Sequence, residues 1–200
     1  MTKIKFCGFT RPSDIDAANR LNADYIGFVF AKKSRRCISA QRALELKKLL
    51  KNGTEAVGVF VDADIAEAAE LLERGIIDIA QLHGSEDDAY VRELKERTHK
   101  PVIQAFRIRN PEDAKNAERS PADYVLLDSG AGTGTVFDWR YAKLVKRPYF
   151  LAGGLASWNA GAAVKLLRPF AVDVSSGIET EGAKDYEKMA AFAAAVRKEG

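Results

Sequence analysis

The feature that most constrains the fold of this chain is a repeat of short apolar segments, each followed by an amphipathic or alanine-rich one. The apolar segments are rich in β-branched and aromatic residues, which predicts strands, and the segments between them predict helices. The predicted strands cover residues 4–7, 25–30, 56–61, 76–83, 101–106, 124–128, 149–153 and 171–176. The predicted helices cover residues 13–22, 40–51, 64–74, 86–97, 112–118, 139–146, 158–167 and 184–198.

Strands that alternate with helices in this way form parallel βα units with right-handed crossovers. Two architectures fit, an open doubly wound sheet and a closed (βα)8 barrel, and the count of eight favours the barrel. The chain has 200 residues, close to the lower limit of about 200 for this fold. We find no linker and no change in composition. We therefore expect an α/β fold with one (βα)8 TIM barrel, a single catalytic domain over residues 1–200.

Composition and charge exclude several classes of protein. The chain has 31 Lys and Arg against 28 Asp and Glu, without a long basic run, so we expect no nucleic acid and no membrane surface as partner. No apolar segment reaches the ~18 residues of a transmembrane helix, and the N-terminus lacks the apolar core of a signal peptide. Two cysteines are too few for a disulfide framework or a zinc site. We expect a cytoplasmic protein with reduced thiols.

Polar residues interrupt the apolar pattern on one face of several predicted strands. In a barrel, alternate strand residues face the interior, and the carboxyl ends of the strands form the active-site face. The inward polar residues are Lys5, Cys7, Gln81, His83, Asp128, Asp173 and Ser175. Because an unsatisfied buried polar group costs ~1–3 kcal/mol, their convergence predicts a site, although Gln81 could instead brace the interior by hydrogen bonds.

Most of these residues also have a structural interpretation. Cys7 alone is more often a packing residue. Asp128 could cap the segment that follows it, and His83 could cap its own loop. Lys5 and Asp173 could neutralise each other inside the barrel, a role that we rank above a direct catalytic one.

Glycine-rich loops follow the last two predicted strands, in LAGGL and SSGIE. Barrels often bind phosphate between these two loops, with backbone N–H groups and the N-terminus of a short helix. Glycine lets the backbone approach an anion and serine adds a hydroxyl, although glycine also serves tight turns. The predicted phosphate ligands are Gly153, Gly154, Ser175 and Ser176. Segment 129–135 does not match G-x-G-x-x-G, and we predict a flexible lid there, beside Asp128.

Seven segments of the chain together resemble a known family. They are KFCGFTRPSD, GFVFAKKSRRCIS, GVFVD, QLHG, LLDSGAGTGTVFDW, LAGGL and PFAVDVSSGIE. In this order and spacing, from residue 3 to about residue 190, they resemble the phosphoribosylanthranilate isomerases of tryptophan biosynthesis. The fold of that family is a small (βα)8 barrel, in agreement with the strand count.

The resemblance implies roles for matching residues. Cys7 corresponds to the general base of the family, Asp128 to its general acid, and Arg36 to the arginine that holds the anthranilate carboxylate. The residues matching the family's pocket lining and phosphate loops are Gln81, His83, Asp173, Gly153, Gly154, Ser175 and Ser176. The chain departs from the family pattern at Cys37, where an aromatic residue is usual, at Thr135, where the lid usually has lysine, and at Trp158.

The implied reaction is an Amadori rearrangement of N-(5-phosphoribosyl)anthranilate to 1-(2-carboxyphenylamino)-1-deoxyribulose 5-phosphate. An acid protonates the ring oxygen of the sugar, and a base then removes the proton from C2. A free cysteine has a pKa of about 8.5, so we expect Lys5 to favour the thiolate of Cys7. No metal, redox or nucleotide cofactor is implied, and the sequence leaves a monomer and a homodimer open.

Three other functions fit the sequence less well. A sister isomerase of histidine biosynthesis performs the same rearrangement on another phosphoribosyl substrate, but it has an aspartate where Cys7 stands, and Arg36 also argues against it. Indole-glycerol-phosphate synthase depends on lysine and glutamate at strand ends, a set that we cannot place here. A non-catalytic phosphoribosyl-binding module has no need of both Cys7 and Asp128.

Overall fold

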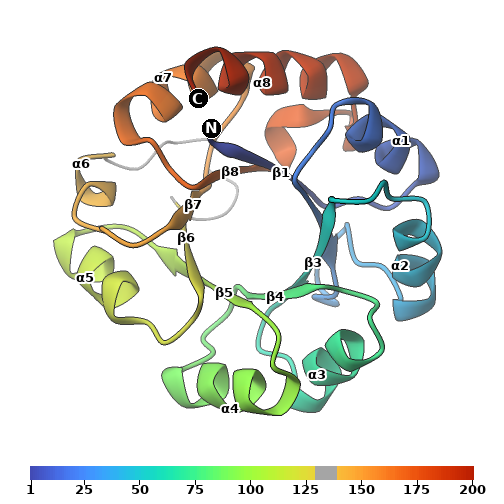
Figure 1. Cartoon of the computed structure of the whole chain (residues 1–200), viewed down its shortest axis with the longest axis vertical. Coiled ribbons are helices and arrows are strands. Elements are labelled where there is room, and N and C mark those ends of the chain that lie inside the picture. Colours follow the sequence, from blue (N-terminus) through green and yellow to red (C-terminus); the bar gives the residue numbers. More distant parts are fainter. Residues whose placement is uncertain (129–138) are drawn as a thin grey trace.

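The computed structural model describes residues 1–128 and 139–200, and its strands β1 to β8 close into one parallel barrel surrounded by helices (Figure 1). Strands β1 to β8 cover Lys3–Cys7, Tyr25–Val29, Glu55–Phe60, Ile79–Leu82, Val102–Arg107, Tyr124–Asp128, Tyr149–Leu151 and Ala171–Val174. Helices α1 to α8 cover Pro12–Arg20, Ala40–Lys47, Ile65–Glu73, Asp88–Thr98, Pro111–Arg119, Trp139–Ala142, Ser157–Leu167 and Tyr186–Glu199. The predicted barrel is thus confirmed, while the predicted lid at 129–135, with Thr135, lies outside the described residues.

Several helices begin at a side chain that accepts a hydrogen bond from an amide of the first turn, which supplies a partner for a donor that the helix itself leaves free. These N-caps are Ser39, Asp64, Asp87, Asn110 and Asp185. The caps fix where each helix starts after its loop, and so set how the loops leave the strands.

Several predicted elements are shorter in the structure, above all helix 139–146, of which α6 keeps Trp139–Ala142, and two further segments differ more. The predicted strand 76–83 is reduced to β4, because Ile76 belongs to the turn that ends α3 and its amide donates to the carbonyl of Leu71. Both roles bury apolar side chains, so hydrophobicity alone does not separate them. The residues before α8 form a small antiparallel hairpin, β9 (Glu179–Thr180) and β10 (Ala183–Lys184), preceded by the short helix η1 (Ser176–Ile178).

The strands alternate as predicted between a helix-facing layer and the barrel interior. Ile4 and Phe6 of β1 join the large cluster under the helices. The interior at the amino ends of the strands is filled by apolar side chains, such as Tyr25 and Phe150, whose ring centroids are 5.3 Å apart. Because this end is packed, the polar interior residues lie at the carboxyl ends of the strands.

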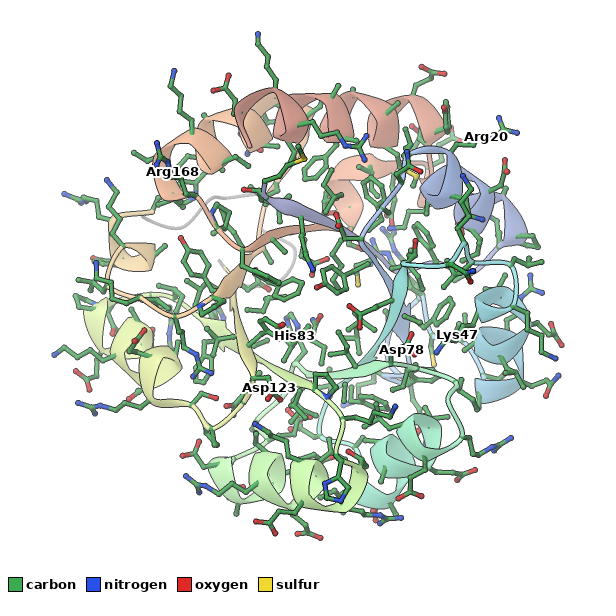
Figure 2. All side chains as sticks on the ribbon, viewed as in Figure 1. Arg20, Lys47, Asp78, His83, Asp123 and Arg168 are labelled. Atoms are coloured by element: carbon green, nitrogen blue, oxygen red, sulfur yellow. The ribbon has the colours of Figure 1, made fainter. Side chains whose placement is uncertain are left out.

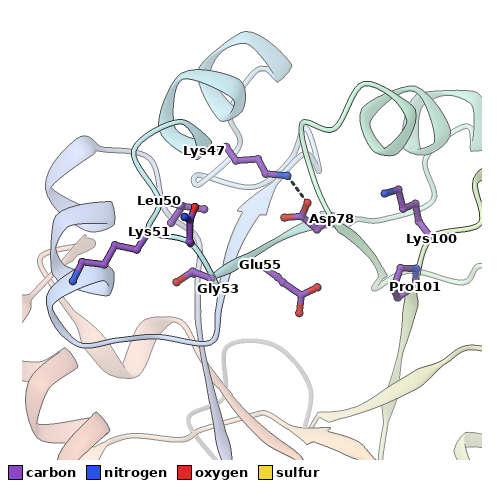
Figure 3. A pocket seen from close by; sticks show the side chains of 10 residues that line it. Lys47, Leu50, Lys51, Gly53, Glu55, Asp78, Lys100 and Pro101 are labelled. Carbon is purple, nitrogen blue, oxygen red and sulfur yellow. Dashed lines mark hydrogen bonds and ion pairs between the residues drawn. The ribbon is translucent and has the colours of Figure 1, made fainter.

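A pocket of about 460 Å³ opens at the amino ends of β3 to β5, on the face opposite those polar residues (Figure 3). Lys47 pairs there with Asp78 at 2.5 Å, and Lys51, Glu55 and Lys100 also line the opening. The helices of the two described ranges are too short or too polar to span a lipid bilayer.

Candidate active site

Cys7 ends strand β1 with its side chain in the barrel, where the residue is 8% exposed. The paired residue on β2 is Gly27, and a Cβ atom there would lie 2.6 Å from the Cys7 sulfur. Gly8 follows with a φ of +86°, a backbone conformation that glycine adopts without strain. The glycines at positions 8 and 27 therefore make room for the thiol, and the sequence analysis overlooked Gly27.

The thiol of Cys7 is not activated by its surroundings. Burial raises its pKa, and the positive charge of Lys5 lowers it by less. Lys5 is itself fully buried, and its Nζ atom is 2.9 Å from Oδ1 of Asp173. Lys5 favours the thiolate, as the sequence predicted, but burial outweighs this effect and the charge of Asp173 opposes it. The free protein holds Cys7 as a thiol.

A chain of hydrogen bonds runs from β4 to β6 across the carboxyl end of the barrel. Nε2 of Gln81 is 2.9 Å from Nδ1 of His83, and Nε2 of His83 is 3.2 Å from Oδ2 of Asp128. Figure 2 shows His83 inside the ring of strands. Oε1 of Gln81 is buried and accepts no hydrogen bond from the residues that the structure describes. These three predicted site residues thus form one connected group.

Arg36 lies over the opposite side of the opening, beside Cys7. Its side chain passes so close to Gly8 that a Cβ atom there would be 2.4 Å from Cδ of Arg36. The guanidinium is held by Glu179, with Nε and Nη2 donating to its two carboxylate oxygens at 2.7 Å each. Burial would raise the pKa of Glu179, but the hydrogen bonds from Arg36 and Lys184 outweigh it and lower the pKa to about 2.

Lys184 links the pair of Arg36 and Glu179 to the loop after β8. Its Nζ atom donates to Oε1 of Glu179 at 2.7 Å and to the carbonyl oxygen of Ser175 at 3.0 Å. Burial lowers the pKa of Lys184, and the attraction of Glu179 counters this only in part. Sequence reasoning missed both residues of the pair. The available signal was the glutamate that ends SSGIE and the lysine five residues later, at the start of the predicted last helix.

The two glycine-rich loops predicted to hold phosphate touch each other. A Cβ atom on Gly177 would lie 2.0 Å from the carbonyl oxygen of Leu155, so only glycine permits this approach. Gly153 and Gly154 have φ angles of +85° and +64°. Asn159 of α7 fixes that loop by donating to the carbonyl oxygen of Gly154 at 2.9 Å.

The serines of the second loop play different parts. The side chain of Ser175 faces inward as predicted, and its hydroxyl donates to the carbonyl oxygen of Cys7 at 3.1 Å, which braces the end of β1. Ser176 begins the short helix η1, and the amides of Ser176 and Gly177 donate to no acceptor within the described residues. An anion at this place would meet backbone N–H groups at the start of a helical turn.

The structure therefore brings the predicted site residues to one end of the barrel in two groups. Cys7, Arg36 and Ser175 lie on one side, and Gln81, His83 and Asp128 on the other. Of the residues at which the chain departs from the family pattern, Cys37 is exposed and Trp158 is exposed on α7. In residues 1–128 and 139–200, no group of three or more His, Cys, Asp or Glu side chains is arranged to hold a metal ion.

Comparison with known proteins gives the same family from sequence and from structure. Residues 4–195 match the family model described as N-(5'-phosphoribosyl)anthranilate (PRA) isomerase. A relative of that name from Caldanaerobacter subterraneus subsp. tengcongensis is 43% identical over 204 residues, covering 98% of each chain.

Two solved structures are similar over nearly the whole chain. One is a phosphoribosyl anthranilate isomerase in complex with reduced 1-(o-carboxyphenylamino)-1-deoxyribulose 5-phosphate. It has a TM-score of 0.88 and 32% identity, and covers 99% of this chain and 100% of that one. The other contains monomers generated from the dimeric enzyme of Thermotoga maritima. It has a TM-score of 0.87 and 34% identity, with the same coverage.

Proposed function

We propose a mechanism for this chain from the premise that it belongs to the N-(5'-phosphoribosyl)anthranilate isomerase family. The chain is an isomerase of tryptophan biosynthesis that converts N-(5-phosphoribosyl)anthranilate into 1-(2-carboxyphenylamino)-1-deoxyribulose 5-phosphate. The observation that carries the mechanism is the placement of a thiol and a carboxyl group, Cys7 and Asp128, at the carboxyl ends of two strands of one closed barrel.

In the first step, Asp128 acts as general acid. Its O–H bond breaks and the proton passes to the ring oxygen of the sugar, while the bond between C1 and that oxygen breaks and its electron pair stays on the oxygen. The lone pair of the anthranilate nitrogen forms the C=N bond of an iminium. Proton transfer by a positioned side chain contributes ~10²–10⁴ to the rate.

In the second step, Cys7 acts as general base. The iminium acidifies the C2 proton, which the thiolate removes to give an enolamine. The enolamine becomes the ketone when C1 takes a proton from solvent and the C2 hydroxyl loses its proton to solvent. Because burial holds Cys7 as a thiol in the free protein, the thiol must first release its proton to solvent. The positive charges of Lys5 and Lys184 favour the thiolate that remains.

The ends of the substrate are held by opposite parts of the opening. Arg36 binds the anthranilate carboxylate through the edge of its guanidinium that Glu179 does not occupy, since Nη1 makes no hydrogen bond to a described residue. The sugar phosphate lies on the backbone amides of Gly153, Gly154, Ser176 and Gly177. Gln81, His83 and Asp173 line the space between the carboxylate and phosphate sites. Asp173 is held there by its ion pair with Lys5.

We further propose that residues 1–200 work as one catalytic domain and that the reaction takes place in the cytoplasm, where both thiols stay reduced. Neither cysteine forms a disulfide in the structure. The oligomeric state is a monomer or a homodimer. The dimeric relative from Thermotoga maritima makes the homodimer a specific candidate.

The function is tested with the purified protein and two substrates. The fluorescence of phosphoribosylanthranilate should decay on addition of the protein, and the product should be the ribulose phosphate. The matching substrate of the histidine-pathway isomerase serves as control and should react far more slowly. Binding of phosphoribosylanthranilate without turnover would identify a binding module instead.

A further inference from the structure

We propose that His83 is a positioning residue that directs the acidic proton of Asp128 onto Oδ1, and that Gln81 sets the tautomer of His83 that this requires. The inference rests on the proposed role of Asp128 as general acid and names two residues that prepare it. It follows from the order of donors and acceptors along the hydrogen-bond chain from Gln81 to Asp128.

The order of donors starts at Gln81, whose amide nitrogen can only donate a hydrogen bond. It lies 2.9 Å from Nδ1 of His83, so Nδ1 accepts. In a neutral imidazole the other nitrogen then carries the proton. Nε2 of His83 is 3.2 Å from Oδ2 of Asp128 and donates to it.

The opposite orientation of the Gln81 amide breaks this chain. Oε1 would then face Nδ1 and require the proton there, which would turn the lone pair of Nε2 toward the Asp128 carboxylate. Nε2 of His83 and Oδ2 of Asp128 would then both be acceptors, and their repulsion disfavours that arrangement whenever Asp128 is ionised. With a neutral imidazole, only an amide that donates to His83 fits both protonation states of Asp128.

The buried oxygen of Gln81 supports a role other than packing. Gln81 is 1% exposed, and its Oε1 accepts no hydrogen bond from any described residue. A buried acceptor without a donor destabilises a fold. An apolar residue would fill the place beside Ile79 without that loss, so the gain from Gln81 is its nitrogen bond to His83.

The consequence concerns which oxygen of Asp128 carries the acidic proton. With Oδ2 accepting from His83, the proton of the neutral carboxyl group sits on Oδ1. When that proton moves to the ring oxygen of the sugar, negative charge develops on the carboxylate, and the bond from His83 becomes charge-assisted and stronger. An interaction that strengthens in this way lowers the barrier rather than only tightening binding.

The tautomer is read directly by ¹⁵N NMR of labelled protein at about pH 8, where an ordinary histidine is neutral. The chain has two histidines, and His99→Gln identifies the signals of the other one. We expect His83 protonated on Nε2 in the parent. In Gln81→Glu, a carboxylate that can only accept should move the proton to Nδ1 or charge the ring. A parent protonated on Nδ1, or no change in Gln81→Glu, overturns the inference whatever the activity.

The catalytic effect is read from a pair of variants at position 83. His83→Leu removes the donor, and kcat should fall about 10- to 100-fold, with a smaller change in KM. His83→Gln places an amide nitrogen near the position of Nε2 and should recover most of kcat. Equal kcat losses in the Leu and Gln variants would contradict a donor role. Thermal unfolding checks that both variants are folded, and Gln81→Glu remains as the second probe.

A third comparison separates this inference from the assignment of the acid. In an Asp128→Asn background, His83→Leu should add little further loss, because it acts through the carboxyl group. The same loss in both backgrounds would show that His83 acts independently, while Asp128 remains the acid. Parent-like turnover of Asp128→Asn itself would instead reject the acid, and the NMR result would stand apart from it.

Discussion

The carboxylate of Glu179 holds the guanidinium of Arg36 through two hydrogen bonds of 2.7 Å, although the residues lie 143 positions apart in the chain. A bidentate hydrogen bond between planar groups fixes the orientation of the guanidinium as well as its position. One edge of Arg36 is therefore occupied by the protein. The edge that includes Nη1 is the one available to a carboxylate of the substrate.

Replacement of Arg36 should weaken substrate binding more than it slows the reaction. A hydrogen bond to a charged group contributes ~1.5–3 kcal/mol, so Arg36→Ala should raise KM about 10- to 100-fold. If the carboxylate is held equally in the ground and transition states, kcat changes much less. Arg36→Lys keeps the charge but cannot bind a carboxylate in the bidentate way, and we expect an intermediate KM. A KM for Arg36→Ala within error of the parent rejects the role.

Glu179 should stabilise the fold at neutral pH and lose that effect in acid. Its pKa falls from an ordinary 4.5 to about 2 in the folded protein. This shift corresponds to a contribution of at most ~3 kcal/mol to the free energy of unfolding. A lowered pKa means that the contribution is present above pH 4.5 and fades as pH falls toward 2. Urea unfolding of the parent and Glu179→Gln should show a difference that shrinks across this window. A difference that is the same at pH 7 and pH 3 contradicts the assignment.

The reactivity of Cys7 should follow its raised pKa. Iodoacetamide reacts with the thiolate, so in a Cys37→Ser protein the alkylation rate of Cys7 should rise about tenfold per pH unit between pH 7 and 8. The exposed Cys37, measured in Cys7→Ser, should react faster at pH 7. Alkylation of Cys7 should abolish turnover, and product should protect against it. A rate for Cys7 that has already levelled off at pH 7 would mean a preformed thiolate.

The loop predicted to hold phosphate should not tolerate a side chain. Gly154→Val places a bulky group where the backbone meets the anion, so KM should rise and sulfate should no longer bind. Gly53→Val is a matched control, because Gly53 also has a positive φ, of +96°, with nothing within 4 Å of its Cβ position. A valine there is also strained by the positive φ, but it does not touch the loop. Equal effects of the two substitutions on KM would count against the phosphate site.

The sequence predicted the parts of this molecule that depend on local pattern. Alternation along β1 placed Lys5 and Cys7 inside the barrel, and the helix-facing cluster around Ile4 confirms that orientation. Periodicity did not separate the end of α3 from the start of β4, since Ile76 is buried in either role.

The network around Arg36 could not be predicted in the same way. The partners Glu179 and Lys184 come from a hairpin whose strands have two residues each, too short to produce a pattern. The raised pKa of Cys7 is a balance between burial and several charges. The sequence shows the charges but not the burial. It therefore predicted that Lys5 lowers the pKa of Cys7, but not that burial raises this pKa by more.

The central claim is that Cys7 removes the C2 proton, and steady-state turnover of phosphoribosylanthranilate by a folded Cys7→Ser protein tests it most directly. Serine has nearly the size of cysteine, but its hydroxyl is far less acidic and supplies no anionic base near neutral pH. We predict that Cys7→Ser unfolds at nearly the parent temperature, binds a product analogue, and loses at least ~10² of kcat. A kcat within a few-fold of the parent would show that Cys7 is a packing residue and not the base.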